Sequence, residues 1–368
     1  MITGAGTLAA LHRSFFGTVR FRTVVTQGKA DKAEPQKAPL MKFRKLGKNG
    51  PRVSAIALGC MSFAGFYGKT DRDEAFATLD AARDSGITFL DTSDLYGQGL
   101  SEEWIGAYQA DRNHRFQIAT KGGIVAGAPR GTADNSEPYL REKLEASMTR
   151  LGVDHVELYY VHRREFSRPI EEVTETLLKF KEEGLIGAIG FSEIAPASLR
   201  RAATVGHVDA VQNEYSLWSR LPELGLIQTC EELGTAFVPF SPLGRGILGD
   251  TDLDPPNFRD MDFRKANPRF QPQAFAANMR HVEALREFAE MRGWSTAAVA
   301  IAWTLQMSRG NIPIPGTRTA EHLLEWADAD EIIFSKSDWE ELDRIMPMGW
   351  AEGDRYSDAQ IVGIERYC

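Results

Sequence analysis

Short apolar segments rich in β-branched and aromatic residues alternate, from Met41 onward, with amphipathic segments of helical period. This alternation is typical of βαβ units built on a parallel sheet. The pattern predicts strands near residues 55–60, 87–92, 116–121, 156–162, 186–191, 209–213, 236–240 and 311–315. It predicts helices near residues 71–85, 101–109, 136–151, 171–183, 196–204, 222–233, 296–307 and 319–327. Eight strand and helix pairs indicate an α/β fold with a closed (β/α)8 barrel, the TIM barrel.

The predicted strands are nearly continuous in apolar or β-prone residues, as in AIALGC, FQIATK, VELYYVH and AFVPF. Such runs are expected where both faces of a strand are covered. The helix predicted at 136–151 carries apolar residues every three or four positions, at Leu140, Leu144, Met148 and Leu151. That spacing places the four side chains on one helix face, so we assign them to the core.

Two segments stand outside the regular alternation. A proline-rich insertion follows the seventh strand and runs from Leu243 to about Arg280, with DPPN, NPRF and QPQ in it. Long loops in compact domains are usually lids or binding loops, so we expect this one to border a site. After the barrel, the pattern predicts one more helix at 337–346 and a tail at 347–368 that folds over an opening.

The first forty residues have a different character from the rest of the chain. Four basic residues precede the first acid, Asp31, and ADKAEPQKAP has the composition of a linker. An organellar presequence has this character, and so does an extension of no functional weight upstream of Met41. We predict a disordered extension at 1–40 and one barrel domain at 41–368, in the cytoplasm or, if 1–40 is a presequence, in an organelle.

Composition and charge narrow the classes of protein. With 43% hydrophobic and 26% charged residues, the chain has the composition of a soluble globular protein that buries a sizeable core. A net charge of −8 argues against nucleic acid as a partner, and no apolar stretch is long enough to cross a membrane. The cysteines, Cys60, Cys230 and Cys368, stand far apart, so the sequence predicts neither a metal site nor a disulfide. Association of several copies of the chain is left open.

Polar residues occur where several predicted strands end. Asp91, Lys121, His162, Ser192 and Gln212 all occupy such positions. The active site of a parallel barrel lies at the carboxyl ends of its strands. Each residue alone has an ordinary structural explanation, such as a salt bridge or a buried hydrogen bond. The ordered recurrence of acid, lysine and histidine on strands two, three and four favours one shared site.

These residues, together with Tyr96, suit the reduction of a carbonyl group. That reaction adds a hydride to carbon and a proton to oxygen, whose developing negative charge must be stabilised. The Tyr96 hydroxyl can supply the proton, and a nearby Lys121 ammonium is expected to lower its pKa from about 10. Asp91 is expected to hold the lysine charged. A neutral His162 can orient the carbonyl oxygen by a hydrogen bond.

Seven motifs occur in order between residues 41 and 342: GITFLDTSDLYGQGLSEEWIG, IATKGG, LYYVHR, GFSE, VQNEYSLWSR, FVPFSPLGRG and IPIPGTR. With these motifs the chain resembles the aldo-keto reductase family, closest to the branch of broad-specificity aldehyde and pyridoxal reductases. The tail motif GDRY adds to the likeness. The resemblance implies a (β/α)8 barrel that binds NADPH or NADP in an extended pose. It makes Tyr96 the proton donor, with Asp91 and Lys121 tuning it and His162 orienting the substrate.

The resemblance also implies a set of cofactor-binding residues. Ser192 and Gln212 would bond the nicotinamide carboxamide, and Phe240 would stack on the ring, where the family usually has a tyrosine. The residues around the pyrophosphate would be Ser241, Leu243, Gly244 and Arg245.

The adenosine end is implied to bind at the last barrel helix. Gly316, Thr317 and Arg318 would open that helix, whose free N–H groups favour a phosphate. Arg318 suggests the adenosine 2′-phosphate, hence NADPH over NADH, since a guanidinium matches phosphate. A solvated residue at a helix start is the alternative explanation of Arg318.

This chain departs from the family pattern at several positions of the cofactor set. His322 stands where an arginine is common, and Glu325-Trp326 replaces Glu-Asn near the adenine. We keep His322 and Glu325 as adenine-end residues, and Trp326 or His322 can stack on the ring. Glu193 replaces the asparagine that usually follows Ser192.

Four aromatic residues are candidates for the substrate pocket: Phe63, Phe66, Tyr67 and Trp218. They fall in loops expected to rim the barrel mouth, which predicts an aromatic, fairly apolar pocket. Packing of the lid and tail is the equally weighted alternative. With these residues the sequence predicts an NADPH-dependent enzyme that reduces small aldehydes and reactive ketones to alcohols.

Three other functions are alternatives to carbonyl reduction. A Schiff-base enzyme with Lys121 as nucleophile leaves SPLGRG and IPGTR unexplained. A metal-dependent hydrolase lacks ligands, since the chain has seven histidines and no HxH pair. A cofactor-sensing subunit, like the potassium-channel β subunits that resemble this family, would keep the same four residues and turn over very slowly.

Overall fold

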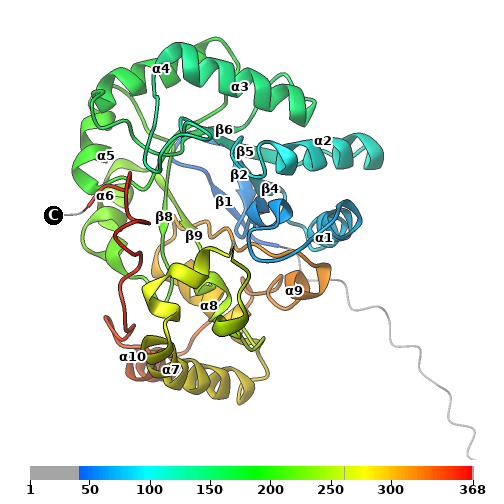
Figure 1. The fold of residues 1–368 in the computed structure, drawn as a ribbon, viewed down its shortest axis with the longest axis vertical. Helices are drawn as coiled ribbons and strands as arrows, with labels where there is room; N and C mark the ends of the chain where they lie inside the picture. The colour runs from blue at the N-terminus through cyan, green and yellow to red at the C-terminus, as the bar shows by residue number, and fades with distance from the viewer. Residues whose placement is uncertain (1–40, 261, 367–368) are drawn as a thin grey trace, which may run out of the picture. The chain divides into compact units, whose positions relative to one another are not determined.

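The computed structural model describes residues 41–260 and 262–366 (Figure 1). The extension predicted at 1–40 lies outside the described residues. A parallel sheet forms the centre of the fold, and its strand order follows the chain. Its seven strands are β3 (Leu58–Gly59), β4 (Phe89–Asp91), β5 (Gln117–Gly122), β6 (Leu158–Val161), β7 (Ile189–Ser192), β8 (Ala210–Glu214) and β9 (Ala236–Phe240).

The segment 311–315 closes this sheet into a barrel. Its N–H groups at Ile312 and Ile314 donate to carbonyl groups of β9 at 2.8 and 3.0 Å. Its carbonyl groups at Pro313 and Pro315 accept from N–H groups around β3 at 3.0 and 2.8 Å. The prediction of an eighth regular strand here was wrong, because the two prolines have no N–H to donate toward β3. The barrel architecture itself is confirmed.

Helices surround the barrel (Figure 1). The ring consists of α1 (Arg72–Asp84), α2 (Leu100–Arg112), α3 (Glu137–Leu151), α4 (Ile170–Glu182), α5 (Pro196–Ala203), α6 (Leu226–Leu233), α8 (Thr296–Met307) and α9 (Ala320–Leu324). Two further helices, α7 (Pro272–Glu290) and α10 (Lys336–Ile345), pack against each other. The α3 helix has a proline in its first turn and ends at Gly152 in the left-handed conformation, φ 67°. These are the signals from which the sequence predicted it.

Two layers of buried side chains hold the strands in place, one between the helices and the barrel wall and one inside the barrel. Leu140, Leu144, Met148 and Leu151 are buried between the helices and the barrel wall, as their spacing predicted. Inside the barrel, small and branched side chains fill the interior together with Phe89 and Tyr160. A hairpin of β1 (Phe43–Lys45) and β2 (Arg52–Ser54) contributes Leu46 and Val53 to this inner layer. Since β2 leads directly into β3, the hairpin covers the amino ends of the strands and leaves the carboxyl ends for a site.

Three sequence-predicted segments differ from the structure. The helix predicted at 222–233 starts at Leu226, after the 3-10 turn η2 (Leu221–Glu223). The helix predicted at 319–327 is only α9, because the chain turns more tightly after it: the N–H of Trp326 bonds the carbonyl of Leu323. The insertion after β9 is built from 3-10 turns and ends where α7 begins at Pro272. The four turns are η3 (Gly244–Gly246), η4 (Pro255–Asn257), η5 (Phe263–Ala266) and η6 (Pro268–Phe270).

Candidate active site

The four candidate catalytic residues meet at the carboxyl ends of neighbouring strands. Asp91 ends β4, Lys121 lies in β5, His162 follows β6, and Tyr96 lies in the turn after β4. Each side chain is at most 9% exposed. Residues that occupy separate strands in the sequence are therefore brought into one buried cluster, as the barrel geometry requires.

Lys121 is the centre of this cluster. Its Nζ contacts the Asp91 carboxylate, donates to the carbonyl oxygen of Thr92 at 2.7 Å, and lies 3.4 Å from the Tyr96 hydroxyl oxygen. On the other side, Nε2 of Gln212 donates to Oδ2 of Asp91 at 2.7 Å. A continuous series of hydrogen bonds thus runs from β8 through the carboxylate and the ammonium to the tyrosine.

The pKa of Tyr96 differs from the sequence-based expectation. Burial raises the pKa of Tyr96 above its ordinary value, and the positive charge of Lys121 opposes that rise. We expected Lys121 to give a lowered pKa, but the cost of burying a phenolate is larger than the attraction. Burial also acts to lower the pKa of Lys121, but Asp91 and Tyr96 outweigh it and leave that pKa raised. Tyr96 therefore keeps its proton and Lys121 its charge at neutral pH.

His162 is a neutral imidazole at the edge of the cluster. Burial, followed by the charges of Arg163 and Lys121, holds the pKa of His162 well below its ordinary value of 6.5. Its Nδ1 lies 3.1 Å from Oγ of Ser93, which leaves Nε2 for another partner. The ring stands edge-on to Tyr96, with 6.0 Å between the centroids. In this position a neutral His162 has one ring nitrogen without a hydrogen-bond partner in the described chain, beside the Tyr96 ring.

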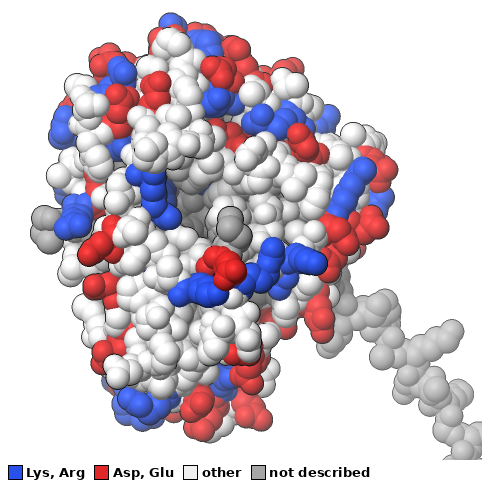
Figure 2. Space-filling view, viewed as in Figure 1, with Lys and Arg blue, Asp and Glu red and all other residues white. Residues whose placement is uncertain are grey.

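A cavity of about 620 Å³ opens beside the cluster, and Figure 2 shows a hollow on this face with basic side chains along its border. Tyr96, His162 and Asp91 line it. Most residues predicted to bind a cofactor are also on its wall: Ser192, Gln212, Phe240, Ser241, Leu243, Arg245, Gly316, Thr317, Arg318, His322 and Glu325. Gly244 lies behind the wall, where an added Cβ would approach the Trp218 ring to 2.8 Å.

The two predicted phosphate-binding arginines have different surroundings. Arg245 is buried, with Nη2 donating to Glu214 at 3.0 Å and its guanidinium 4.7 Å from the Tyr356 ring centroid. Arg318 is half-buried, and its Nη1 donates to the carbonyl oxygen of Lys69 at 3.0 Å. Within the described chain Arg318 has no carboxylate partner, so its charge is available to an anion.

Only two of the four predicted substrate residues line the cavity. Phe66 and Tyr67 are on the wall, and the Phe66 ring lies 6.2 Å from that of Tyr96. Phe63 is fully buried in the core, and Trp218 is 4% exposed and stacked on Trp350. For Trp218, the alternative of packing within the lid and tail describes its position, whereas Phe63 belongs to the core of the barrel.

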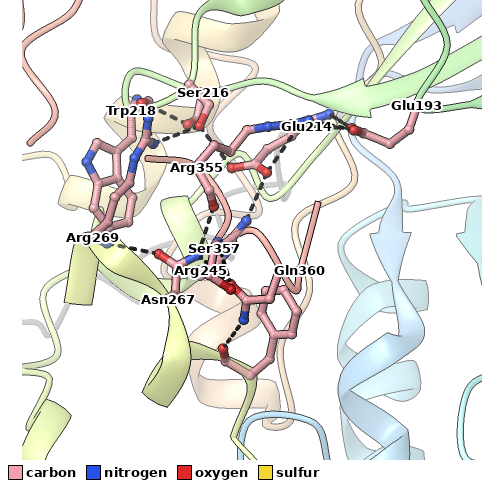
Figure 3. A network of polar contacts seen from close by, with 12 residues as sticks. Glu193, Glu214, Ser216, Trp218, Arg245, Asn267, Arg269, Arg355, Ser357 and Gln360 are labelled. Carbon is pink, nitrogen blue, oxygen red and sulfur yellow. Dashed lines mark hydrogen bonds and ion pairs between the residues drawn. The ribbon is translucent and has the colours of Figure 1, made fainter. Parts of the chain in front are cut away.

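The tail provides a roof that the sequence did not fully indicate. Arg355, from the GDRY motif, donates to both carboxylate oxygens of Glu193, at 2.7 and 3.1 Å, and Figure 3 shows it turned toward Glu193 and Glu214. The remaining roof residues come from the tail and from the loop after β5: Tyr356, Gln360, Val362, Ile364, Ile124, Val125, Ala128, Pro129 and Arg130. In the sequence, the GDRY motif could have indicated the tail residues of this roof. The Gly- and Pro-containing loop that follows IATKGG could have indicated the residues after β5.

No group of three or more His, Cys, Asp or Glu side chains is placed to hold a metal ion in the part of the chain that the structure describes. None of the helices described combines the length and the apolar character that crossing a bilayer requires.

Comparison with known sequences identifies the family. The profile of the Aldo/keto reductase family matches residues 55–347. The chain belongs to the aldo/keto reductase family. This aldo/keto reductase is 37% identical to a probable aldo-keto reductase of Glycine max over 315 residues, 85% of this chain and 91% of that protein. It is 36% identical to an NADP(+) aldo-keto reductase of Schizosaccharomyces pombe over 320 residues, 85% of this chain and 94% of that protein.

Solved structures of the family have the same fold. The glycerol dehydrogenase of Gluconobacter oxydans superposes with a TM-score of 0.76 at 25% identity, over 86% of this chain and 97% of that one. An aldo-keto reductase of Bacillus halodurans in its holo form gives a TM-score of 0.68 at 25% identity, over 83% and 96%. These matches confirm the predicted family and barrel for this aldo/keto reductase.

Proposed function

We propose that this aldo/keto reductase uses NADPH to reduce aldehydes and reactive ketones to alcohols, with Tyr96 as the proton donor. The observation that carries the proposal is the 3.4 Å contact between the Tyr96 hydroxyl and the Lys121 ammonium, on a cavity that His162 also lines. Family membership and the NADP(+) named for the Schizosaccharomyces pombe relative support the cofactor.

The residues of the cavity wall fit an NADP dinucleotide. Gly316 is exposed on the wall and has no side chain, so a ligand can approach its backbone closely. A Cβ at this position would lie 2.9 Å from the carbonyl oxygen of Gly59, so a larger residue would disturb the packing against β3. Arg318 offers a charge without a carboxylate partner in the described chain, as a phosphate needs. Phe240 offers an aromatic face, and Ser192 and Gln212 offer polar groups for a carboxamide.

Gln212 is prepared for one particular contact. Its side-chain NH2 group donates to Asp91, so its carbonyl oxygen remains to accept a hydrogen bond from an amide. Since that bond fixes which end of the side chain faces the cavity, we assign Gln212 to orienting the nicotinamide carboxamide. Ser192 already accepts from Nη1 of Arg163 at 3.2 Å, which leaves its hydroxyl hydrogen as a donor for the same carboxamide.

The chain's own residues then complete the reaction. NADPH, when bound, supplies the hydride that adds to the carbonyl carbon. Tyr96 donates its proton to the carbonyl oxygen, and the raised pKa keeps that proton available at neutral pH. Lys121, held charged by Asp91, stabilises the tyrosinate that remains. His162 stays neutral and directs the carbonyl oxygen toward Tyr96 through Nε2.

A steady-state assay tests the proposal directly. The loss of NADPH absorbance is followed with a panel of aldehydes, and NADPH binding is titrated in parallel by fluorescence. We expect aldehyde-dependent turnover at rates of roughly 1 to 1,000 per second, in the ordinary range of enzymes. Tight NADPH binding with almost no turnover on any aldehyde would instead favour the cofactor-sensing subunit.

A further inference from the structure

Arg163 stands beside the cluster of Tyr96 and His162, and the exposed Arg130 lies on the same cavity wall. Arg130 lies in the loop after β5, and Arg163 directly follows His162; both line the cavity. Arg163 Nη1 donates to the carbonyl oxygen of His162 at 2.6 Å and to Oγ of Ser192 at 3.2 Å. The Arg130 guanidinium lies 5.3 Å from the ring centroid of Phe263. Within residues 41–260 and 262–366, neither arginine forms an ion pair.

The other arginines of the cavity wall are engaged differently. Arg245 is paired with Glu214 at 3.0 Å, and Arg264 with Asp262 at 2.7 Å. Arg318 belongs to the segment assigned to the adenosine phosphate. Arg163 and Arg130 are therefore distinguished by having neither a carboxylate partner in the described chain nor a part in the proposed cofactor set.

Arg163 adds positive charge to this end of the cavity. Burial is the main cause that lowers the pKa values of Arg130 and His162, and the charge of Arg163 adds to both shifts. Glu193 also lies within its electrostatic reach, but Arg355 holds that carboxylate by two hydrogen bonds. Gathering like charges in a partly buried wall costs free energy unless an anion neutralises them.

We infer that the substrate carries a carboxylate or phosphate group, which Arg163 binds together with Arg130. The inference rests on the proposed function and names its substrate class. A guanidinium binds such anions through paired N–H donors, and Arg163 has donors left beyond the two bonds of its Nη1. Because Arg163 follows His162 in the chain, the anion is bound next to the group that orients the carbonyl. Phe66 and Tyr67 contribute to the apolar part of the wall.

The anionic group takes no part in the chemical step. A hydride from NADPH adds to the carbonyl carbon and a proton from Tyr96 adds to the oxygen. NADPH is oxidised to NADP+, the aldehyde is reduced to a primary alcohol, and solvent returns a proton to Tyr96. The anion contributes binding and orientation, which raise the rate by holding the carbonyl in one position.

The test uses aldehydes that differ only in the anionic group. The pairs are para-carboxybenzaldehyde with para-methylbenzaldehyde, and glyceraldehyde phosphate with glyceraldehyde. Wild-type enzyme should have the higher kcat/KM on the anionic member of at least one pair, and that pair identifies the anion. Arg163→Met should lower this kcat/KM on the order of 10- to 100-fold and leave the neutral member nearly unchanged. Arg163→Lys should recover part of the preference, since the charge is kept.

Three results would overturn the inference. The first is equal kcat/KM within both pairs for wild-type enzyme, and the second is an equal loss on both members in Arg163→Met. The third is a weaker NADPH affinity in Arg163→Met with the anionic preference retained, which would assign the arginine to the cofactor phosphates. Arg201→Met is the matched control, because Arg201 is exposed on α5 and paired with Glu171 at 2.8 Å.

A binding measurement separates this inference from the proposed function. Calorimetric titration compares para-(hydroxymethyl)benzoate with para-methylbenzyl alcohol, which bind without turnover. Selective binding of the benzoate that depends on Arg163, in an enzyme that reduces no aldehyde, would reject the proposed function and support the anion site. Absence of selective binding for this pair and for the matching phosphate pair, glycerol phosphate with glycerol, would reject the anion site.

Discussion

Gln212 and Asp91 are joined by a 2.7 Å hydrogen bond, although 121 positions separate them in the chain. This contact links a residue assigned to the nicotinamide carboxamide with the carboxylate that holds Lys121. Binding of the cofactor amide and the charge of Lys121 are therefore connected through the Asp91 side chain. A disturbance at Gln212 is expected to affect both.

Replacing Gln212 with methionine tests that connection. Gln212→Met keeps the length of the side chain but leaves Oδ2 of Asp91 buried without its donor. We expect a loss of about 1.5–3 kcal/mol in the free energy of unfolding, the range for hydrogen bonds to charged groups, and weaker NADPH binding. Urea unfolding and fluorescence titration measure the two effects. Unchanged stability would show that another group takes over the bond.

The pH dependence of reduction is expected to be broad. Turnover requires a protonated Tyr96, whose pKa is raised, and a neutral His162, whose pKa is held well below 6.5. The basic limb of kcat should therefore lie above the ordinary tyrosine pKa of about 10. The acid limb should lie well below 6.5. A pH profile measured at saturating NADPH that falls with a midpoint near 6.5 would contradict the assignment of His162 as a buried neutral group.

The lowered pKa of His162 is also expected to make the free energy of unfolding depend on pH. Its folded pKa is below its unfolded value, so on acidification the unfolded chain takes up the proton first. The stability associated with His162 is complete above about pH 6.5 and is lost as the pH falls toward the folded pKa. His162→Asn should flatten this part of the curve of unfolding free energy against pH. His114→Asn, a substitution outside the cavity, is the control. It should leave the slope of that curve as it is in the wild-type protein.

Arg318 is expected to set the preference for NADPH over NADH. Arg318→Ala removes the charge assigned to the adenosine 2′-phosphate and should raise the KM for NADPH on the order of 10- to 100-fold. The KM for NADH should change little, because NADH lacks that phosphate. Arg309→Ala, at an exposed arginine outside the cavity, is the control. Equal changes in the two KM values would remove the assignment.

Arg355 is expected to hold the tail by its pair with Glu193. Arg355→Met leaves the Glu193 carboxylate buried and uncompensated, at a cost of about 3–5 kcal/mol in unfolding free energy. Adding Glu193→Gln should restore a large part of that loss, since both charges are then gone. Urea unfolding of the two single variants and the double variant measures the coupling. Strictly additive losses would mean that the two side chains do not depend on each other.

The sequence predicted the barrel because each strand carries a continuous apolar run that only a covered sheet explains. It did not predict how the barrel closes, since Pro313 and Pro315 alter hydrogen bonding without changing the apolar pattern. It also missed α7, because the helix starts at Pro272, inside a segment whose prolines indicated a loop. Proline marks a helix start as readily as a break, and the sequence alone did not distinguish them.

For a related reason, the sequence predicted the catalytic residues of the candidate site better than its substrate residues. Asp91, Lys121 and His162 follow strand ends, and barrel geometry alone brings such positions together. Phe63 and Phe66 are three residues apart in one loop, yet only Phe66 lines the cavity, because the course of a loop depends on distant packing. The raised pKa of Tyr96 likewise depends on the depth of burial, which no motif records.

Tyr96 is proposed to give its proton to the substrate oxygen. The most direct measurement is single-turnover reduction of an aldehyde by Tyr96→Phe with NADPH already bound, followed by the loss of NADPH absorbance. Tyr108→Phe, which removes a hydroxyl bonded to Asp80 on the outer helices, is the matched control. We expect Tyr96→Phe to slow the chemical step by about 100- to 10,000-fold with NADPH affinity unchanged, and Tyr108→Phe to retain the wild-type rate. A Tyr96→Phe variant that reduces aldehydes at the wild-type rate would contradict the account.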